Sequence, residues 1–165
     1  MWAAALIAAS FAESSPAAAL DSALAVVPAR SRLAEALAGV RSMHRDGLDW
    51  ETARDEIERR HGALSPVQTI NNAAVIAAAL LWGDGDFGRT VGLAVQGGWD
   101  TDCTAPTAGS TFGAMHGARA LPARWTDPLD DRIRSALSGF DGARIRDVAE
   151  RTGRLARARA LAPGG

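Results

Sequence analysis

The alanine-rich stretch from Thr69 to Trp82 is the feature that most limits the folds open to this chain. Its sequence, TINNAAVIAAALLW, contains no charged residue, no glycine and no proline. Alanine and leucine are among the strongest helix formers, and a helix that is apolar on most of its circumference is normally buried. The sequence therefore predicts a helix over residues 69–82, at the centre of a helical bundle.

Signals for helices continue along the rest of the chain. Short polar side chains that can accept hydrogen bonds from free backbone N–H groups precede four predicted helices, at Ser15, Ser31, Asp49 and Asp86. No segment alternates polar and apolar residues with a period of two, and none is typical of a hairpin. Helices are predicted over residues 2–13, 16–27, 69–82, 87–96, 102–120, 128–138 and 144–160, with two more that begin after Ser31 and Asp49. These patterns predict an all-α fold, a single compact multi-helix bundle forming one domain over residues 1–165.

Composition narrows the possible partners. The chain has 18 basic residues, all of them arginine, and 19 acidic residues, for a formal net charge of −1. This balance offers no electrostatic reason to bind nucleic acid or an anionic membrane, so neither is expected as a partner. The apolar start lacks the basic residues of a signal peptide, and no stretch reaches the roughly 18 apolar residues of a membrane span. A cytoplasmic protein is therefore predicted.

Two glycine patterns in the sequence resemble known motifs. Residues 83–88 spell G-x-G-x-x-G, but a predicted helix precedes them, whereas a dinucleotide-binding loop follows a strand. We interpret them as a glycine that ends one helix and an aspartate that begins the next. Gly109, Gly113 and Gly117 recur every four residues. That spacing predicts a face of small residues that a neighbouring helix approaches closely.

The residues best suited to bind a metal ion lie in the segment Gly98-Trp-Asp-Thr-Asp102. A turn there would direct the carboxylates of Asp100 and Asp102, with the Thr101 hydroxyl or carbonyl, at one point, and hard cations such as Mg²⁺ or Mn²⁺ prefer such oxygen ligands. Helix capping is the alternative, with Asp102 as the capping residue and Asp100 interacting with the helix dipole. Spacing alone leaves both interpretations open.

Residues 69–125 resemble the C-terminal signature of the ADP-ribosylglycohydrolase family, which is all-helical. The resemblance is carried by Asn71-Asn72, Gly85-Asp-Phe87, Gly98-Trp-Asp-Thr-Asp102, Ala108-Gly-Ser110, Gly113-Ala-Met-His-Gly117 and Leu121-Pro-Ala-Arg-Trp125. It implies a hydrolase that uses two Mg²⁺ or Mn²⁺ ions to cleave the N- or O-glycosidic bond joining ADP-ribose to a protein side chain or a small acceptor.

The resemblance also implies roles for individual residues. Asp100 and Asp102 match metal ligands of the family, and Cys103 stands where the family usually has a hydroxyl ligand. A thiol is a poor ligand for a hard cation, so Cys103 is expected to weaken the site or only to pack. Trp99 and Thr101 are expected to contact substrate, with a core position as the alternative for Trp99.

The chain departs from the family in one respect. The family's Gly-Asp and Thr/Ser-Asp-Asp motifs, which supply further acidic groups, are not found before residue 69. This departure, with a first predicted helix that has no capping residue, predicts a truncated portion of the fold that lacks activity alone. The alternatives are a non-catalytic helical interaction module or one half of a split enzyme, with the missing N-terminal segment or a second copy as its partner.

Overall fold

The computed structural model describes residues 1–160, and within them the regular elements are helices, with no β-strand. The helices are α1 (Trp2–Ser10), α2 (Pro16–Leu24), α3 (Arg32–Arg45), α4 (Trp50–His61), α5 (Thr69–Trp82), α6 (Phe87–Gln96), α7 (Thr101–His116), α8 (Ala123–Thr126) and α9 (Ile145–Ala160), with 3-10 turns η1 (Ala118–Ala120) and η2 (Asp127–Leu129). The predicted all-α class is thereby confirmed.

The chain divides into two compact units, Met1–Ala120 and Leu121–Gly165, the second described as far as residue 160. Each is considered by itself, and the assignment of residues 1–165 to one domain stays a prediction. No helix in the described part combines the length and the apolar character that crossing a bilayer requires.

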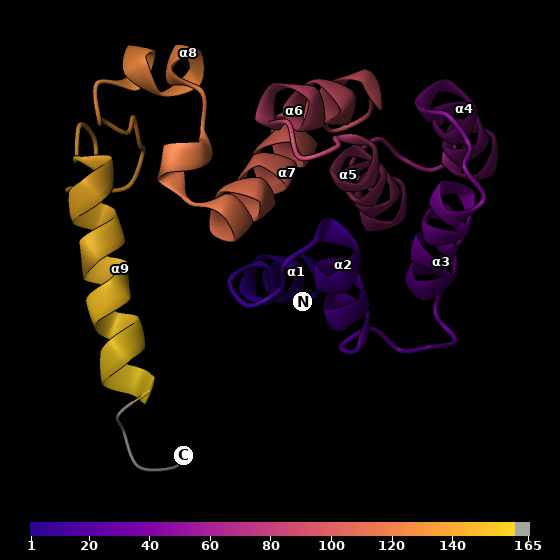
Figure 1. The fold of residues 1–165 in the computed structure, drawn as a ribbon, viewed down its shortest axis with the longest axis horizontal. Helices are drawn as coiled ribbons and strands as arrows, with labels where there is room; N and C mark the ends of the chain where they lie inside the picture. Colours follow the sequence, from indigo (N-terminus) through magenta and orange to yellow (C-terminus); the bar gives the residue numbers. More distant parts are fainter. Residues whose placement is uncertain (161–165) are drawn as a thin grey trace. The chain divides into compact units, whose positions relative to one another are not determined.

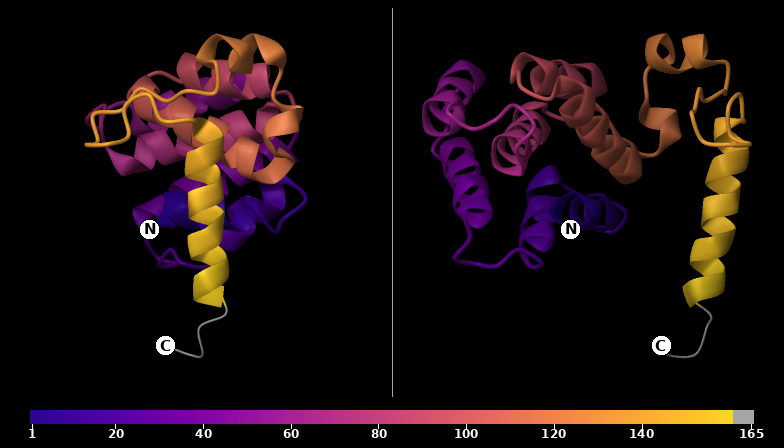
Figure 2. Two further views of the ribbon diagram at one scale, coloured as in Figure 1. Left: turned by 90° about the vertical axis from the view of Figure 1, so that its left-hand side faces the viewer. Right: turned by 180° about the vertical axis from the view of Figure 1, so that it is seen from behind.

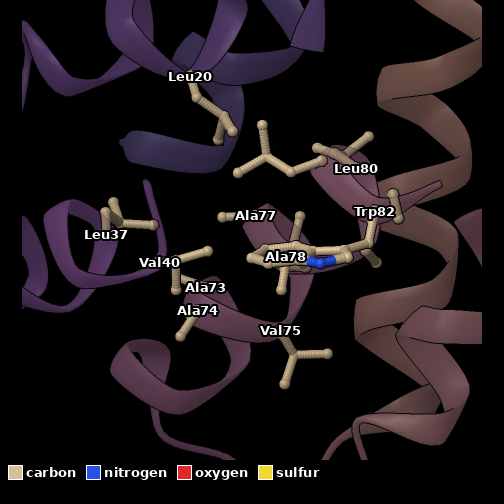
Figure 3. Close-up of a cluster of buried hydrophobic side chains, with 14 of the residues drawn as sticks. Leu20, Leu37, Val40, Ala73, Ala74, Val75, Ala77, Ala78, Leu80 and Trp82 are labelled. Atoms are coloured by element: carbon tan, nitrogen blue, oxygen red, sulfur yellow. The ribbon is translucent and has the colours of Figure 1, made fainter. Parts of the chain in front are cut away.

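Helix α5 forms the centre of the first unit, as its composition predicts. Every residue from Asn71 to Trp82 is buried, and α5 contacts α2, α3, α4, α6 and α7. Figure 1 shows α5 between the α3–α4 pair and the α6–α7 pair, and the view from behind in Figure 2 agrees. Leu20, Leu37 and Val40 converge on its alanine side chains in Figure 3. The small alanines let these five helices lie close to α5, which places the α6–α7 connection against it.

The predicted helix starts are confirmed at the four capping residues. Each capping side chain accepts a hydrogen bond from the backbone N–H three residues ahead: Ser15 from Ala18 (3.2 Å), Ser31 from Ala34 (3.1 Å), Asp49 from Thr52 (2.8 Å) and Asp86 from Arg89 (2.6 Å). Gly83 ends α5 just before the Asp86 cap, so residues 83–88 join two helices, as interpreted from the sequence.

The predicted helix over residues 128–138 is wrong. Asp130 and Asp131 both take positive φ, at 47° and 54°, which ends the η2 turn. The chain then forms an isolated antiparallel bridge between Arg132 and Arg144, with Ile133 N–H donating to Ala143 O at 3.0 Å. This single bridge lies outside any β-strand, so the expectation that no segment forms a hairpin is not contradicted in the described residues. Turn-forming residues outweigh helix propensity here because left-handed backbone cannot continue a helix.

The glycine row of α7 does not serve close helix packing, so that prediction is wrong. A Cβ at Gly109 would make ordinary contacts at 3.6 Å with Phe87 and Val91, and nothing lies within 4 Å of one at Gly113. Gly117 has a conformational reason, because its backbone (φ 77°, ψ 164°) ends α7 in a region that almost only glycine occupies. This is why α7 stops at His116 rather than at residue 120.

Candidate metal site

The connection from α6 to α7 is shaped by its backbone. Gly97 ends α6 so close to α5 that a Cβ there would lie 2.4 Å from Val75 Cγ1, closer than any real packing. Gly98 then takes φ +79° and Trp99 φ +56°. Two successive left-handed residues turn the chain sharply, so that α7 begins at Thr101.

Trp99 is held in a costly conformation. A bulky residue with positive φ is destabilised by about 1–3 kcal/mol unless its surroundings compensate. Its indole is half-buried and packs against the hydrophobic core. Core packing therefore accounts for part of its role, and contact with substrate stays a prediction for this residue and for Thr101. The Thr101 side chain is also half-buried and makes no side-chain hydrogen bond in the described part of the chain.

Asp100 occupies the capping position of α7 without capping it. Its backbone (φ −88°, ψ 65°) lies outside the extended region used at Ser15, Ser31, Asp49 and Asp86, and its carboxylate accepts no hydrogen bond from a backbone N–H of the first turn. Asp102 lies inside the first turn, so the interpretation of Asp102 as the capping residue is wrong. Its charge still interacts favourably with the helix dipole. Capping therefore does not explain why Asp100 carries a carboxylate.

The side chains of Asp100, Asp102 and Cys103 form one cluster. Their potential ligand atoms all lie within 4.8 Å of one another, with Asp100 half-buried and the other two exposed. Among the described residues, no arginine lies within ion-pair distance of either carboxylate, although the protein has 18 basic residues. Two adjacent carboxylates without a cationic partner repel each other, and a cation would relieve that repulsion.

The protonation of the Cys103 thiol depends on its acidic neighbours. A hydrogen bond with the Asp100 carboxylate, then burial, and then the charges of Asp100 and Asp102 raise the pKa of Cys103. The protonated thiol is thus favoured at neutral pH, and a neutral thiol is a poor ligand for a hard cation. The donor set fits Mg²⁺ or Mn²⁺ at the two carboxylates and does not fit it at Cys103.

One buried side chain from another helix accepts a hydrogen bond from the backbone of the cluster. Asn72 of α5 accepts a hydrogen bond through Oδ1 from the Asp100 N–H, at 3.2 Å, across 28 positions of the sequence. Asn72 belongs to the family signature, but its sequence context indicates no role, because nothing local shows that it faces Asp100. His116, in contrast, packs against Phe112 at the far end of α7, with ring centroids 4.3 Å apart and the ring planes tilted by 44°.

The fold and this cluster define a class, an all-helical protein with a candidate acidic metal site at the start of a helix. The model of the ADP-ribosylglycohydrolase family matches residues 1–162, nearly the whole chain, so this chain belongs to the ADP-ribosylglycohydrolase family. Glycohydrolase activity is what the family suggests, and its members are in general metal-dependent. Neither the curated proteins nor the solved structures contain a match to the chain.

Proposed function

We propose that this chain carries part of a Mg²⁺- or Mn²⁺-dependent site that cleaves the N- or O-glycosidic bond between ADP-ribose and a protein side chain or small acceptor. The observation that carries the proposal is the pair Asp100 and Asp102, two neighbouring carboxylates that neither cap a helix nor pair with an arginine in the described residues. The family match supports the class of reaction.

In this proposal the two aspartates hold the metal. Bound divalent ions would polarise ribose hydroxyls and lower the pKa of a bound water. Cleavage at the anomeric carbon develops positive charge on the ribose, which nearby carboxylates stabilise. Asp102 is exposed and open to a ligand from solvent, whereas Asp100 is half-buried and held by the backbone around it. Trp99 and Thr101 flank Asp100 in sequence and would line the substrate side of the site.

Two carboxylates hold a divalent ion only weakly, since such an ion takes about six oxygen ligands and water or another group has to supply the rest. Before residue 69 the sequence contains neither the family's early Gly-Asp motif nor its Thr/Ser-Asp-Asp motif. We therefore propose that hydrolysis requires further acidic ligands from another segment or another chain, and that this chain alone binds metal without turnover.

Thermal unfolding tests the metal site first. The midpoint is measured in EDTA, then in millimolar Mg²⁺ or Mn²⁺. An ion present at 100 times its dissociation constant stabilises the fold by about 2.7 kcal/mol, or about 5–10 °C. Asp84→Ala serves as a control, because Asp84 belongs to a second Asp-x-Asp sequence but its carboxylate lies 3.4 Å from the Arg89 guanidinium and its backbone has positive φ. This variant should keep the response of the midpoint to the ions. A midpoint that does not respond to either ion contradicts the proposed site.

Turnover is tested with a family member's segment that carries both missing motifs, mixed or co-expressed with this chain. Release of ADP-ribose from an ADP-ribosylated arginine or serine peptide is measured with and without that segment. Hydrolysis only in the mixture supports a split or incomplete enzyme. A stable complex without hydrolysis favours the interaction module instead.

The module alternative rests on exposed apolar side chains around α1. The helix buries Trp2, Leu6 and Ser10 against its neighbours, so its apolar face is largely covered, but Phe11 after its end is 77% exposed. Multi-angle light scattering on the chain and on Phe11→Ser tests this alternative. A dimer that the substitution dissociates favours the module, and a monomer in both cases argues against it.

A further inference from the structure

Asn72 links two segments that are distant in the sequence. Its Nδ2 donates to the backbone carbonyls of Pro66 (2.7 Å) and Gln68 (2.8 Å), in the loop before α5, while its Oδ1 accepts from Asp100 N–H at 3.2 Å. The side chain is 8% exposed. Both amide hydrogens and the amide oxygen therefore have partners.

This set of partners permits one orientation of the amide. A flipped amide would point its two N–H donors at the Asp100 N–H and its oxygen at two carbonyl oxygens, which is unfavourable on both sides. The Asn72 oxygen is thereby held towards Asp100. Because α5 is buried along its length, the position of this oxygen is as rigid as the core.

The hydrogen bond from Asp100 coincides with its unusual backbone. Capping aspartates at positions 49 and 86 have extended backbone, with ψ of 168° and 125°, which directs their carboxylates over the first turn. Asp100 has ψ 65°, and its carboxylate instead lies with Asp102 and Cys103. The bond from the Asp100 N–H to α5 is therefore found at a helix start whose aspartate does not cap.

We infer that Asn72 is a positioning residue for the metal site: it holds Asp100 in a non-capping backbone conformation, so that the carboxylate stays available to a divalent cation. This inference rests on the metal binding proposed above. Without Asn72, Asp100 relaxes towards the capping conformation and its carboxylate turns to the N–H groups of α7. Outer partners that orient a metal ligand typically change metal affinity by about 10- to 100-fold when removed.

The test compares Asn72→Ala with Asn71→Ala. Asn71 is a fully buried neighbour on α5 and donates to Ser65 O at 3.1 Å, in the same preceding loop, but has no bond to Asp100. Mn²⁺ affinity is measured by calorimetry for both variants and for the wild-type chain. The exchange rate of the Asp100 amide is measured by NMR without metal. Asn72→Gln, which keeps the amide but moves it by one methylene, replaces Asn72→Ala if the latter does not fold.

We expect Asn72→Ala to bind Mn²⁺ about 10- to 100-fold more weakly and to exchange the Asp100 amide faster, with its unfolding midpoint close to that of Asn71→Ala. Asn71→Ala should bind Mn²⁺ like the wild-type chain. Equal Mn²⁺ affinities in the wild-type chain and Asn72→Ala overturn the inference. If the wild-type chain binds no Mn²⁺, the proposed function fails, and an unchanged exchange rate of the Asp100 amide in Asn72→Ala overturns the tether separately.

Discussion

Gly97 lies so close to Val75 that any side chain at position 97 would overlap it. The overlap involves the whole valine, with an added Cβ placed 2.4 Å from Cγ1, 2.9 Å from Cγ2 and 3.2 Å from Cβ. A β-branched side chain cannot rotate out of the way, since its χ1 is restricted in a helix. The connection carrying Asp100 is thus seated on α5 by one close contact.

Gly97→Ala is expected to destabilise the protein by about 1–3 kcal/mol, because the added methyl group forces α5 and the connection apart. Urea unfolding measures this loss. The double variant Gly97→Ala/Val75→Ala should recover part of it, since the second substitution removes the overlapping methyl groups. Additive losses in the double variant would contradict the contact.

Asp102→Ala is expected to weaken Mn²⁺ binding by more than about tenfold, because it removes one of two ligand carboxylates. Titration calorimetry compares it with Asp84→Ala, the exposed aspartate of the other Asp-x-Asp sequence. The control should leave affinity unchanged. Unchanged Mn²⁺ affinity in Asp102→Ala would refute the site assignment.

Cys103→Thr is expected to raise the affinity for Mg²⁺ and Mn²⁺ severalfold, because it replaces a thiol that prefers softer metals with a hydroxyl. Cys103→Ala, which removes the thiol without adding an oxygen, is the matched control and should change affinity little. The same affinity in the Thr and Ala variants would show that position 103 is not a ligand position.

Gly113→Ala is expected to stabilise the protein by about 1 kcal/mol, since glycine inside a helix is unfavourable and no atom lies within 4 Å of the added Cβ. The melting midpoint should rise by about 2–4 °C. Gly117→Ala should lower it, because φ 77° and ψ 164° are closed to alanine. Two shifts of the same sign would contradict this account of α7.

The free energy of unfolding is expected to fall as the pH is lowered from 7.5 to 5.5, in part because His61 becomes protonated more readily in the unfolded chain. Burial, followed by the positive charges of Arg60 and Arg32, lowers the pKa of His61 below its ordinary 6.5, with Glu35 opposing. In this pH range the His61 side chain binds more protons in the unfolded chain than in the folded one, so its contribution to stability is lost on acidification. Urea unfolding of His61→Gln should show a shallower decrease. A decrease as steep as that of the wild-type chain would exclude His61 as a contributor.

Local patterns were sufficient where local forces decide the structure. The start of α6 after Asp86 and the end of α5 at Trp82 follow from hydrogen bonds and propensities within a few residues. The predicted helix over residues 128–138 failed because Asp130 and Asp131 adopt left-handed backbone, which their neighbours in sequence do not require. A carboxylate of Asp131 instead pairs with Arg146, a partner 15 residues away.

The sequence by itself determined the helical class, the central place of α5 and the segment in which the acidic residues lie, because these depend on propensity, apolar content and residue identity. Only the tertiary structure decided that Asp100 does not cap α7, since that outcome depends on packing the connection at Gly97 against Val75 and on the bond from Asp100 to Asn72. The Asn72 side chain and the Asp100 backbone N–H, 28 positions apart, meet only after α5, α6 and α7 have packed. No local sequence pattern indicates which residues so far apart in the chain will come into contact.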